Sequence, residues 1–287
     1  MMREGLKAKF AEIGGIIERG KRFVVVSHLR PDGDALGSSV ALGRSLQLMG
    51  KEVEVINQHA TPENLRFMGG HKMVSVAGPE LRPADAVFIL DTADEKRIGA
   101  DAETAIAATG FRVVIDHHIT NSGYGDVSVV DAESPATGQI LYQLMKELGL
   151  PFDPVIREAL WVAIVTDTGS FQYRNTTGET MRIAAVLLDE GVDVAKISQA
   201  LYATRPARKV RLIGELLAGM DIGLDGRYSS WAMTRDVQGR LGLRPGDKEG
   251  LVEELRAVEG VVVAALFDEL ADGEIRLSMR SKEGGVD

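Results

Sequence analysis

Cysteine is absent from all 287 residues of the sequence. This absence excludes disulfides, thiolate metal sites, iron–sulfur clusters and a cysteine nucleophile, and it fits a reducing cytoplasm. Long apolar runs are also lacking, because runs such as Val261–Phe267 are far shorter than the ~18 residues that a membrane helix needs. The N-terminus carries Glu4, Lys7 and Lys9 instead of the apolar core of a signal peptide. We therefore expect a cytoplasmic protein that does not bind membranes.

An excess of basic charge is lacking as well. The chain has 33 Lys and Arg against 42 Asp and Glu, which leaves a net charge of −9. Proteins bind long duplex DNA mostly through Lys and Arg on phosphates, so we expect no binding of long duplex DNA. A small anionic substrate is compatible with this charge, because bound metal ions can supply positive charge locally. Length and composition are those of a folded globular protein with about two domains.

Short apolar runs alternate with helical stretches along the first two thirds of the chain. Strand-like runs lie at 23–26, 53–56, 86–90 and 111–115. Helical spacing is found at 6–17, 35–49, 137–148, 180–190 and 194–201. This alternation predicts an α/β fold with a doubly wound, mainly parallel sheet, and the unbroken apolar runs indicate strands buried on both faces. The stretch 159–166 fits either a strand or a helix.

The pattern changes after residues 208–220, and we place a boundary around residues 190–220, with 205–217 as a connecting helix. Strands are expected at 228–234, 261–268 and 275–279, and a helix at 248–257. We therefore predict a first domain over residues 1–190, a helical connector over 191–220 and a smaller α/β domain over 221–287.

Acidic and imidazole side chains follow the apolar runs of the first domain. They are His28, Asp32 and Asp34 after the first run, Asp91 after the third, Asp116, His117 and His118 after the fourth, and Asp167 after residues 162–166. In an open α/β sheet, ligands bind beyond the carboxyl ends of the strands. We therefore expect these residues to converge, although they are far apart in sequence.

Five of these residues are aspartates, and the charge argument concerns four of them, at positions 32, 34, 91 and 167. Two divalent cations would balance their charge, whereas clustered carboxylates without metal would repel one another and partly protonate. Imidazole and carboxylate without thiolate suit manganese, magnesium, iron or zinc. The residues therefore favour a two-metal site with one bridging carboxylate.

Together these motifs resemble those of the DHH phosphoesterase superfamily, in order and spacing, across roughly residues 20–190. The resemblance rests on the loop from His28 to Asp34, the segments Asp91-Thr92-Ala93-Asp94 and Asp167-Thr168-Gly169, and the triplet Asp116-His117-His118. The later stretch Leu277–Lys282 resembles a strand of the DHH-associated C-terminal domain. The two-domain length is most similar to the branch of oligoribonucleases (nanoRNases) and phosphoadenosine-phosphate phosphatases.

The resemblance implies a metal ligand role for six residues. One ion would be held by His28, Asp32 and Asp91, and a second by Asp34, Asp91, His117 and Asp167. Asp91 would bridge the two ions and so belong to the catalytic group. Members of the family usually use manganese, with magnesium or another divalent ion as the alternative.

Three further residues have implied roles. Asp116 would stand behind the ligands and orient an imidazole. His118 would be catalytic and face the substrate phosphate, as a charge stabiliser or proton donor. Arg280 would bind a substrate phosphate from the second domain, with the active site in the cleft between the domains.

The resemblance implies a hydrolase that acts through water activated by two metal ions. It would cleave short oligonucleotides to mononucleotides, remove the 3′-phosphate of 3′-phosphoadenosine 5′-phosphate, or do both. The alternatives are a cyclic or linear dinucleotide phosphodiesterase, a manganese-dependent inorganic pyrophosphatase and a non-catalytic nucleotide sensor. A homodimer is left open. The family's Gly-Gly-Gly-His segment is not found in Glu283–Asp287, so we expect a chain that is truncated before that segment.

Two residues near these motifs have two readings each. Arg97 would form a structural ion pair or contact a phosphate, and Asn121 would make a loop hydrogen bond or bind substrate. Trp161 and Trp231 are expected in the core and not as platforms for bases.

Overall fold

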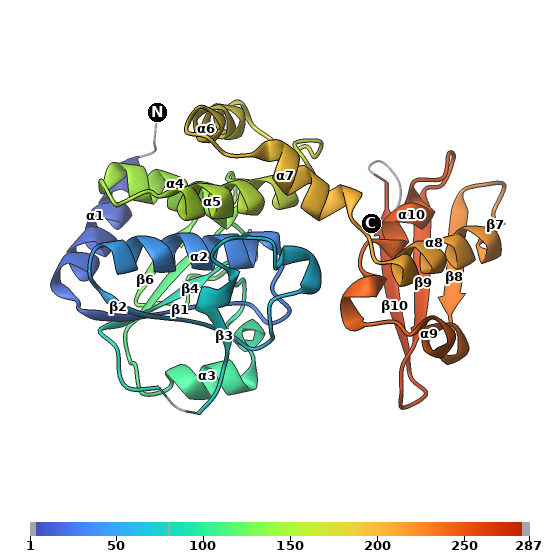
Figure 1. Cartoon of the computed structure of the whole chain (residues 1–287), viewed down its shortest axis with the longest axis horizontal. Coiled ribbons are helices and arrows are strands. Elements are labelled where there is room, and N and C mark those ends of the chain that lie inside the picture. Colours follow the sequence, from blue (N-terminus) through green and yellow to red (C-terminus); the bar gives the residue numbers. More distant parts are fainter. Residues whose placement is uncertain (1–3, 80, 283–287) are drawn as a thin grey trace. The chain divides into compact units, whose positions relative to one another are not determined.

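The computed structural model describes residues 4–79 and 81–282. They form two compact units, divided between Leu201 and Tyr202; Figure 1 shows the elements of each. The expected helical connector over 191–220 contains α8 (Ala207–Gly219). This helix belongs to the second unit, because Leu212 and Leu216 are buried in that unit's core. Within the described ranges, no helix is long and apolar enough to cross a membrane.

The first unit is built on a six-stranded parallel sheet with the order β3-β2-β1-β4-β5-β6. The strands are β1 (Arg22–Ser27), β2 (Glu52–Asn57), β3 (Val74–Val76), β4 (Ala86–Leu90), β5 (Arg112–Asp116) and β6 (Val127–Val130). The direction of winding reverses between β1 and β4, which is where ligands bind in such sheets. This topology confirms the predicted doubly wound parallel sheet.

Both faces of this sheet are covered (Figure 1). Phe23 and Val25 lie in the core shared with α1 (Glu4–Arg19), α2 (Gly33–Leu48), α4 (Thr137–Glu147) and α5 (Pro154–Asp167). Val24 and Val26 lie in the opposite core, with α3 (Ala100–Ile106). Because side chains alternate across a strand, a strand that is apolar at every position needs cover on both sides. The unit also contains α6 (Gly178–Asp189) and α7 (Val194–Ser198).

Helices α2 and α5 approach each other closely through glycines. A Cβ atom on Gly37 would lie 2.4 Å from the carbonyl oxygen of Ala159, and one on Gly33 would lie 2.3 Å from Oγ1 of Thr166. The ambiguous stretch 159–166 is therefore part of a helix, and Asp167 ends that helix instead of following a strand. The close approach brings the start of α2 beside the end of α5.

The second unit has a four-stranded sheet with the order β10-β9-β8-β7. Its strands are β7 (Asp221–Gly223), β8 (Tyr228–Met233), β9 (Val263–Glu269) and β10 (Ile275–Ser281), and its remaining helices are α9 (Arg235–Leu241) and α10 (Leu251–Arg256). β8 and β9 are parallel, and the other pairs are antiparallel. This confirms the smaller α/β domain.

One face of this second sheet packs on helices, with Trp231 and Leu266 in the core beside Leu255. Trp161 of the first unit is also buried, so both tryptophans lie in cores as predicted. On the edge strand β10, Ile275, Leu277 and Met279 are exposed by 65%, 49% and 51%. The expected truncation concerns residues 283–287, which lie outside the described residues.

Candidate metal centre

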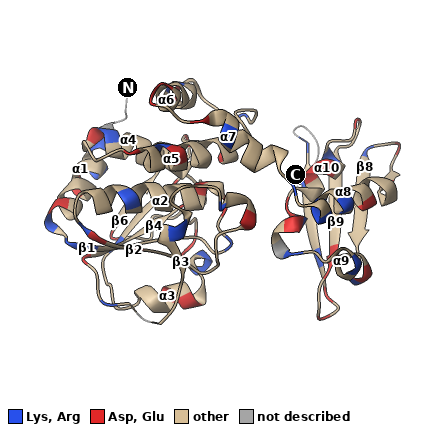
Figure 2. Cartoon of the chain, viewed as in Figure 1, with Lys and Arg blue, Asp and Glu red and all other residues tan. Residues whose placement is uncertain are grey.

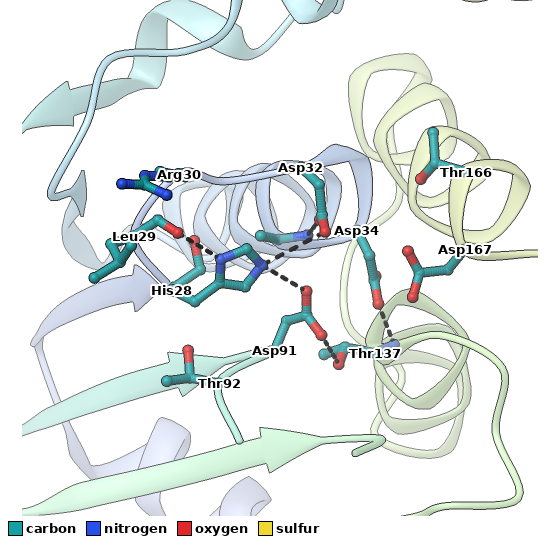
Figure 3. Close-up of polar contacts among 12 residues, drawn as sticks. His28, Leu29, Arg30, Asp32, Asp34, Asp91, Thr92, Thr137, Thr166 and Asp167 are labelled. Carbon is teal, nitrogen blue, oxygen red and sulfur yellow. Dashed lines mark hydrogen bonds and ion pairs between the residues drawn. The ribbon is translucent and has the colours of Figure 1, made fainter. Parts of the chain in front are cut away.

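The predicted metal ligands come together beyond the carboxyl ends of β1, β4 and β5, where the winding of the sheet reverses. Figure 3 shows His28, Asp32, Asp34, Asp91 and Asp167. Among the described residues, potential ligand atoms that lie within 4.8 Å of one another form three groups, and two of these groups together contain all six expected ligands. One group contains His28, Asp32 and Asp91, and the other contains Asp34, His117 and Asp167. A third group contains Asp91 and the triplet 116–118.

The first group is centred on His28, which follows β1 and is buried. Its Nδ1 lies 2.8 Å from the carbonyl oxygen of Leu29, and this contact places the ring proton on Nδ1. Nε2 therefore faces Asp32 Oδ2 at 3.6 Å and Asp91 Oδ2 at 3.5 Å. Asp32 is the N-cap of α2, and its Oδ1 accepts a hydrogen bond from the Ala35 amide at 3.0 Å.

The second group is centred on His117. Its Nε2 lies 3.3 Å from Asp167 Oδ2, 3.4 Å from Asp91 Oδ1 and 3.9 Å from Asp34 Oδ2. This nitrogen is buried and has no hydrogen-bond partner in the described structure. A buried polar atom without a partner is costly, and a cation held between it and the carboxylates would remove that cost. The residues therefore fit a metal ion.

Asp91 lies between the two groups. Its Oδ2 faces His28, whereas its Oδ1 faces His117 and accepts a hydrogen bond from Thr137 Oγ1 at 3.2 Å. The residue follows β4 in the left-handed region, with φ of 53°, which is uncommon for residues other than glycine and often found at functional sites. One carboxylate with an oxygen toward each group has the geometry of a bridging ligand.

Asp34 is wholly buried at the start of α2. Its carboxylate accepts hydrogen bonds from the amides of Thr137 at 2.6 Å and Gly138 at 2.8 Å, and from Ser38 Oγ at 3.0 Å. Both amides belong to the N-terminus of α4, whose dipole stabilises negative charge. The sequence analysis missed this contribution of α4, because nothing in the local pattern links Asp34 to residues 103 and 104 positions away.

The electrostatics of the cluster favour added positive charge. Burial alone would lower the pKa of His28, but Asp32 and Asp91 raise it to about 10. Burial likewise opposes a proton on His117, yet Asp167, Asp91 and Asp34 raise its pKa to about 11. Burial and the nearby carboxylates raise the pKa of Asp34 well above its ordinary value. The negative charge of the carboxylates therefore exceeds what neutral imidazoles can balance. Without another cation, the cluster takes up protons instead.

Asp116 and His118 form a separate contact behind the ligands. His118 Nδ1 lies 2.8 Å from Asp116 Oδ1, which also accepts hydrogen bonds from the amides of His117 and His118. Asp116 Oδ2 accepts from Asn121 Nδ2 at 2.6 Å. The half-buried His118 is thus held with Nε2 as its remaining ring nitrogen. Asn121 also donates to the carbonyl of Thr92, so it makes the loop hydrogen bonds that were one of its two readings.

Arg280 lies on β10 in the second unit and is exposed. Its Nε lies 3.5 Å from Glu253 Oε1. It lines a cavity of about 240 Å³ within that unit, together with Lys248, Arg276 and Ser278. Across both units, Lys and Arg are interspersed with Asp and Glu over the part of the chain that is described (Figure 2).

The donor atoms of the cluster are imidazole nitrogens and carboxylate oxygens. This donor set, with excess negative charge and an unpartnered buried nitrogen, suits divalent cations of the first transition row and magnesium. The cluster is therefore a site for divalent metal.

Comparisons with known proteins agree with this site. Residues 22–164 match the DHH family, N-terminal domain. The chain is 33% identical over 262 residues to the bifunctional oligoribonuclease and PAP phosphatase NrnA of Thermus thermophilus, covering 91% of this chain and 76% of that protein. It is 28% identical to the Bacillus subtilis protein of the same name, covering 89% and 80%.

A solved structure of an exopolyphosphatase-related protein from Bacteroides fragilis superposes with a TM-score of 0.89 at 28% identity, over 96% of this chain and 84% of that one. The relatives and the matched domain confirm the resemblance that the motifs indicated. The chain belongs to the DHH family of phosphoesterases.

Proposed function

We propose that the protein is a manganese-dependent hydrolase of short oligonucleotides that also removes the 3′-phosphate of 3′-phosphoadenosine 5′-phosphate. The observation that carries the proposal is the buried, unpartnered Nε2 of His117, which faces three carboxylates. The names of the Thermus and Bacillus relatives, oligoribonuclease and PAP phosphatase, supply the substrate class.

The proposed ligand sets follow the two groups of donors. His28 and Asp32 hold one ion, Asp34, His117 and Asp167 hold the other, and Asp91 bridges them. Two divalent ions held by these residues would supply a water nucleophile at neutral pH and polarise the phosphoryl oxygens. The amides at the start of α4 fix the carboxylate of Asp34, and Leu29 fixes the ring of His28.

His118 is the proposed catalytic residue beside the ligands. Its Nδ1 proton is held by Asp116, so Nε2 is available to the substrate. From this position, His118 stabilises charge that develops on the phosphoryl group or donates a proton to the leaving sugar oxygen. The buried carboxylate of Asp116 stabilises the charged imidazole in either role.

Substrate binding and cellular location complete the proposal. Arg280 of the second unit binds a substrate phosphate, with support from its exposure and its place on the wall of that unit's cavity. Long duplex DNA is not a substrate, since acidic residues outnumber basic residues in the chain. The lack of cysteine fits the cytoplasm. A homodimer is compatible with this function.

The test is hydrolysis of a labelled RNA dinucleotide, 3′-phosphoadenosine 5′-phosphate and pyrophosphate, each with manganese and with a chelator. Release of mononucleotide or of the 3′-phosphate that depends on manganese supports the proposal. Cleavage of pyrophosphate alone would replace it with a pyrophosphatase. Tight nucleotide binding with no turnover would replace it with a nucleotide sensor.

Variants at the cluster sharpen this test. Asp34→Ala and His117→Ala should lower kcat by more than the 10–100-fold that loss of a residue behind a metal ligand costs. Asp189→Ala is the matched control, because Asp189 is exposed on α6. Circular dichroism verifies that the variants stay folded. Activity near that of wild type in Asp34→Ala with added manganese would contradict the ligand assignment.

A further inference from the structure

Arg30 and Arg97 are two exposed arginines beside the metal centre. Other arginines of the first unit pair with carboxylates, as Arg22 does with Glu52, Arg44 with Asp153 and Arg112 with Glu103. Within residues 4–79 and 81–282, neither Arg30 nor Arg97 forms an ion pair. Arg97 therefore does not make the structural ion pair that was one of its two readings, and its charge is available to a ligand.

The backbone holds the two arginines on adjoining loops. The amide of Leu29 donates a 2.6 Å hydrogen bond to the carbonyl of Arg97, which joins the loop after β1 to the loop after β4. Arg30 adopts the left-handed conformation, with φ of 54°. Its amide donates to His59 Nδ1 at 3.1 Å. A residue other than glycine takes this backbone conformation only where its surroundings impose it.

Asn57 at the end of β2 fixes those surroundings. Its Oδ1 accepts a hydrogen bond from the His59 amide at 3.0 Å, and its Nδ2 donates to the carbonyl of His28 at 3.0 Å. Asn57 is wholly buried. The strained position of Arg30 is thus set by residues from two neighbouring strands, so its backbone is positioned as firmly as that of His28.

The guanidinium of Arg30 does not compete for the metal ligands. Figure 3 shows it beyond His28 and directed away from Asp32 and Asp91. The main chain of Arg97 adjoins the same loop, because its carbonyl accepts the hydrogen bond from the Leu29 amide. The guanidinium of Arg30 therefore lies on the side of His28 that faces away from Asp167, and the backbone of Arg97 is bonded to the loop that carries Arg30.

We infer that Arg30 and Arg97 bind a second phosphate of the substrate, one sugar away from the phosphate that is hydrolysed. Guanidinium groups form two parallel hydrogen bonds with phosphate oxygens, which gives them a preference for this ligand. The inference rests on the proposed function and makes it narrower. The preferred substrates are nucleotides with two phosphates, such as 3′-phosphoadenosine 5′-phosphate, and adenosine 3′-phosphate is a poor substrate.

Paired substrates test the inference. Kinetics with manganese should give 3′-phosphoadenosine 5′-phosphate a KM at least about tenfold below that of adenosine 3′-phosphate, the ratio that corresponds to one charged hydrogen bond. Arg30→Ala/Arg97→Ala should raise the first KM about tenfold and leave the second KM and both kcat values unchanged. Arg182→Ala, an exposed arginine on α6, is the control and should change neither.

Binding measured by calorimetry separates this inference from the proposed function. With calcium in place of manganese, the dissociation constants of both nucleotides are compared in the wild type and the double variant. Tighter binding of 3′-phosphoadenosine 5′-phosphate than of adenosine 3′-phosphate, lost in the double variant, supports the phosphate site. This holds even if neither nucleotide is hydrolysed, because the lack of hydrolysis overturns only the proposed function. Equal affinity for both nucleotides, or an equal change in both, overturns the inference and leaves two solvated loop charges.

Discussion

At the scale of single residues, the carboxylate of Asp116 is held by four hydrogen bonds near the site. Three N–H groups of His117 and His118 point at Oδ1, and Asn121 donates to Oδ2. A buried charge persists only when it is hydrogen-bonded in this way. Its negative charge therefore acts on His118 through a contact that cannot shift without breaking the turn 116–121.

Asp116→Asn should lower kcat by about 10–100-fold with little change in KM. The amide cannot supply the negative charge that stabilises protonated His118, and its N–H₂ group would face either His118 or Asn121. Steady-state kinetics on a dinucleotide measures this split. Asp126→Asn is the control, because Asp126 accepts a hydrogen bond from the Arg112 amide at the opposite end of β5. An equal loss in both variants would contradict a positioning role for Asp116.

Residue types and spacing were enough to predict that the carboxylates and imidazoles after β1, β4 and β5 converge, because the ends of parallel strands share one edge. Asp167 joins them from the end of α5. Residue types and spacing were not enough to predict the donors that hold Asp34. Those donors are main-chain amides of Thr137 and Gly138, and an amide has no sequence signature. The backbone angle of Asp91 was hidden for the same reason.

At the scale of elements, α5 shows why periodicity alone left residues 159–166 undecided. The helix is buried on nearly every side, from Ile156 to Val165, so it has no polar stripe to reveal its period. The deciding signal was at its start, where Asp153 caps the helix and Pro154 follows. This pair is a helix start signal. Arg44 Nε, from α2, lies 2.8 Å from Asp153 Oδ2.

Asp153→Ala should lower the free energy of unfolding by about 1 kcal/mol, because it removes the cap. Asp153→Asn keeps a capping oxygen and removes the charge. Although burial opposes it, hydrogen bonds from Ile156 and Arg44 hold the pKa of Asp153 below 3.8. The charge therefore stabilises the fold above that pH, and this contribution disappears as the pH falls through the folded-state pKa.

Urea unfolding of wild type and Asp153→Asn from pH 3 to pH 7 measures this dependence. The difference between their midpoints should be constant near neutral pH and shrink toward zero at the acid end. A difference that grows on acidification would contradict the assignment of the charge effect to Asp153.

At the scale of the whole molecule, the two units have separate cores. Each has its own sheet and its own helices. The expected metal ligands all lie before residue 201, in the first unit. Ligands stabilise only the structure that binds them, so metal should affect the two units differently. The sequence did not predict the exact position of the division at 201–202, because the amphipathic pattern of α8 fits both a connector helix and a helix packed on a domain core.

Manganese at about 100 times its dissociation constant should stabilise the first unit by about 2.7 kcal/mol. For a unit of this size, that corresponds to a rise in Tm of about 5–10 °C. Differential scanning calorimetry with manganese and with a chelator measures the two transitions separately. Asp34→Ala should abolish the shift. A rise of the same size in the transition of the second unit would show that metal binding is not confined to the first.

The exposed apolar residues of β10 have a consequence for how the protein behaves in concentrated solution. An edge strand offers unpaired backbone groups, and Ile275, Leu277 and Met279 add an apolar surface to them. Arg276 and Arg280 interrupt the run on the opposite side of the same strand, as gatekeepers do in strands prone to self-association. An apolar replacement of Arg280 would therefore promote precipitation as well as remove the proposed phosphate contact, and glutamine is the better replacement for separating these two effects.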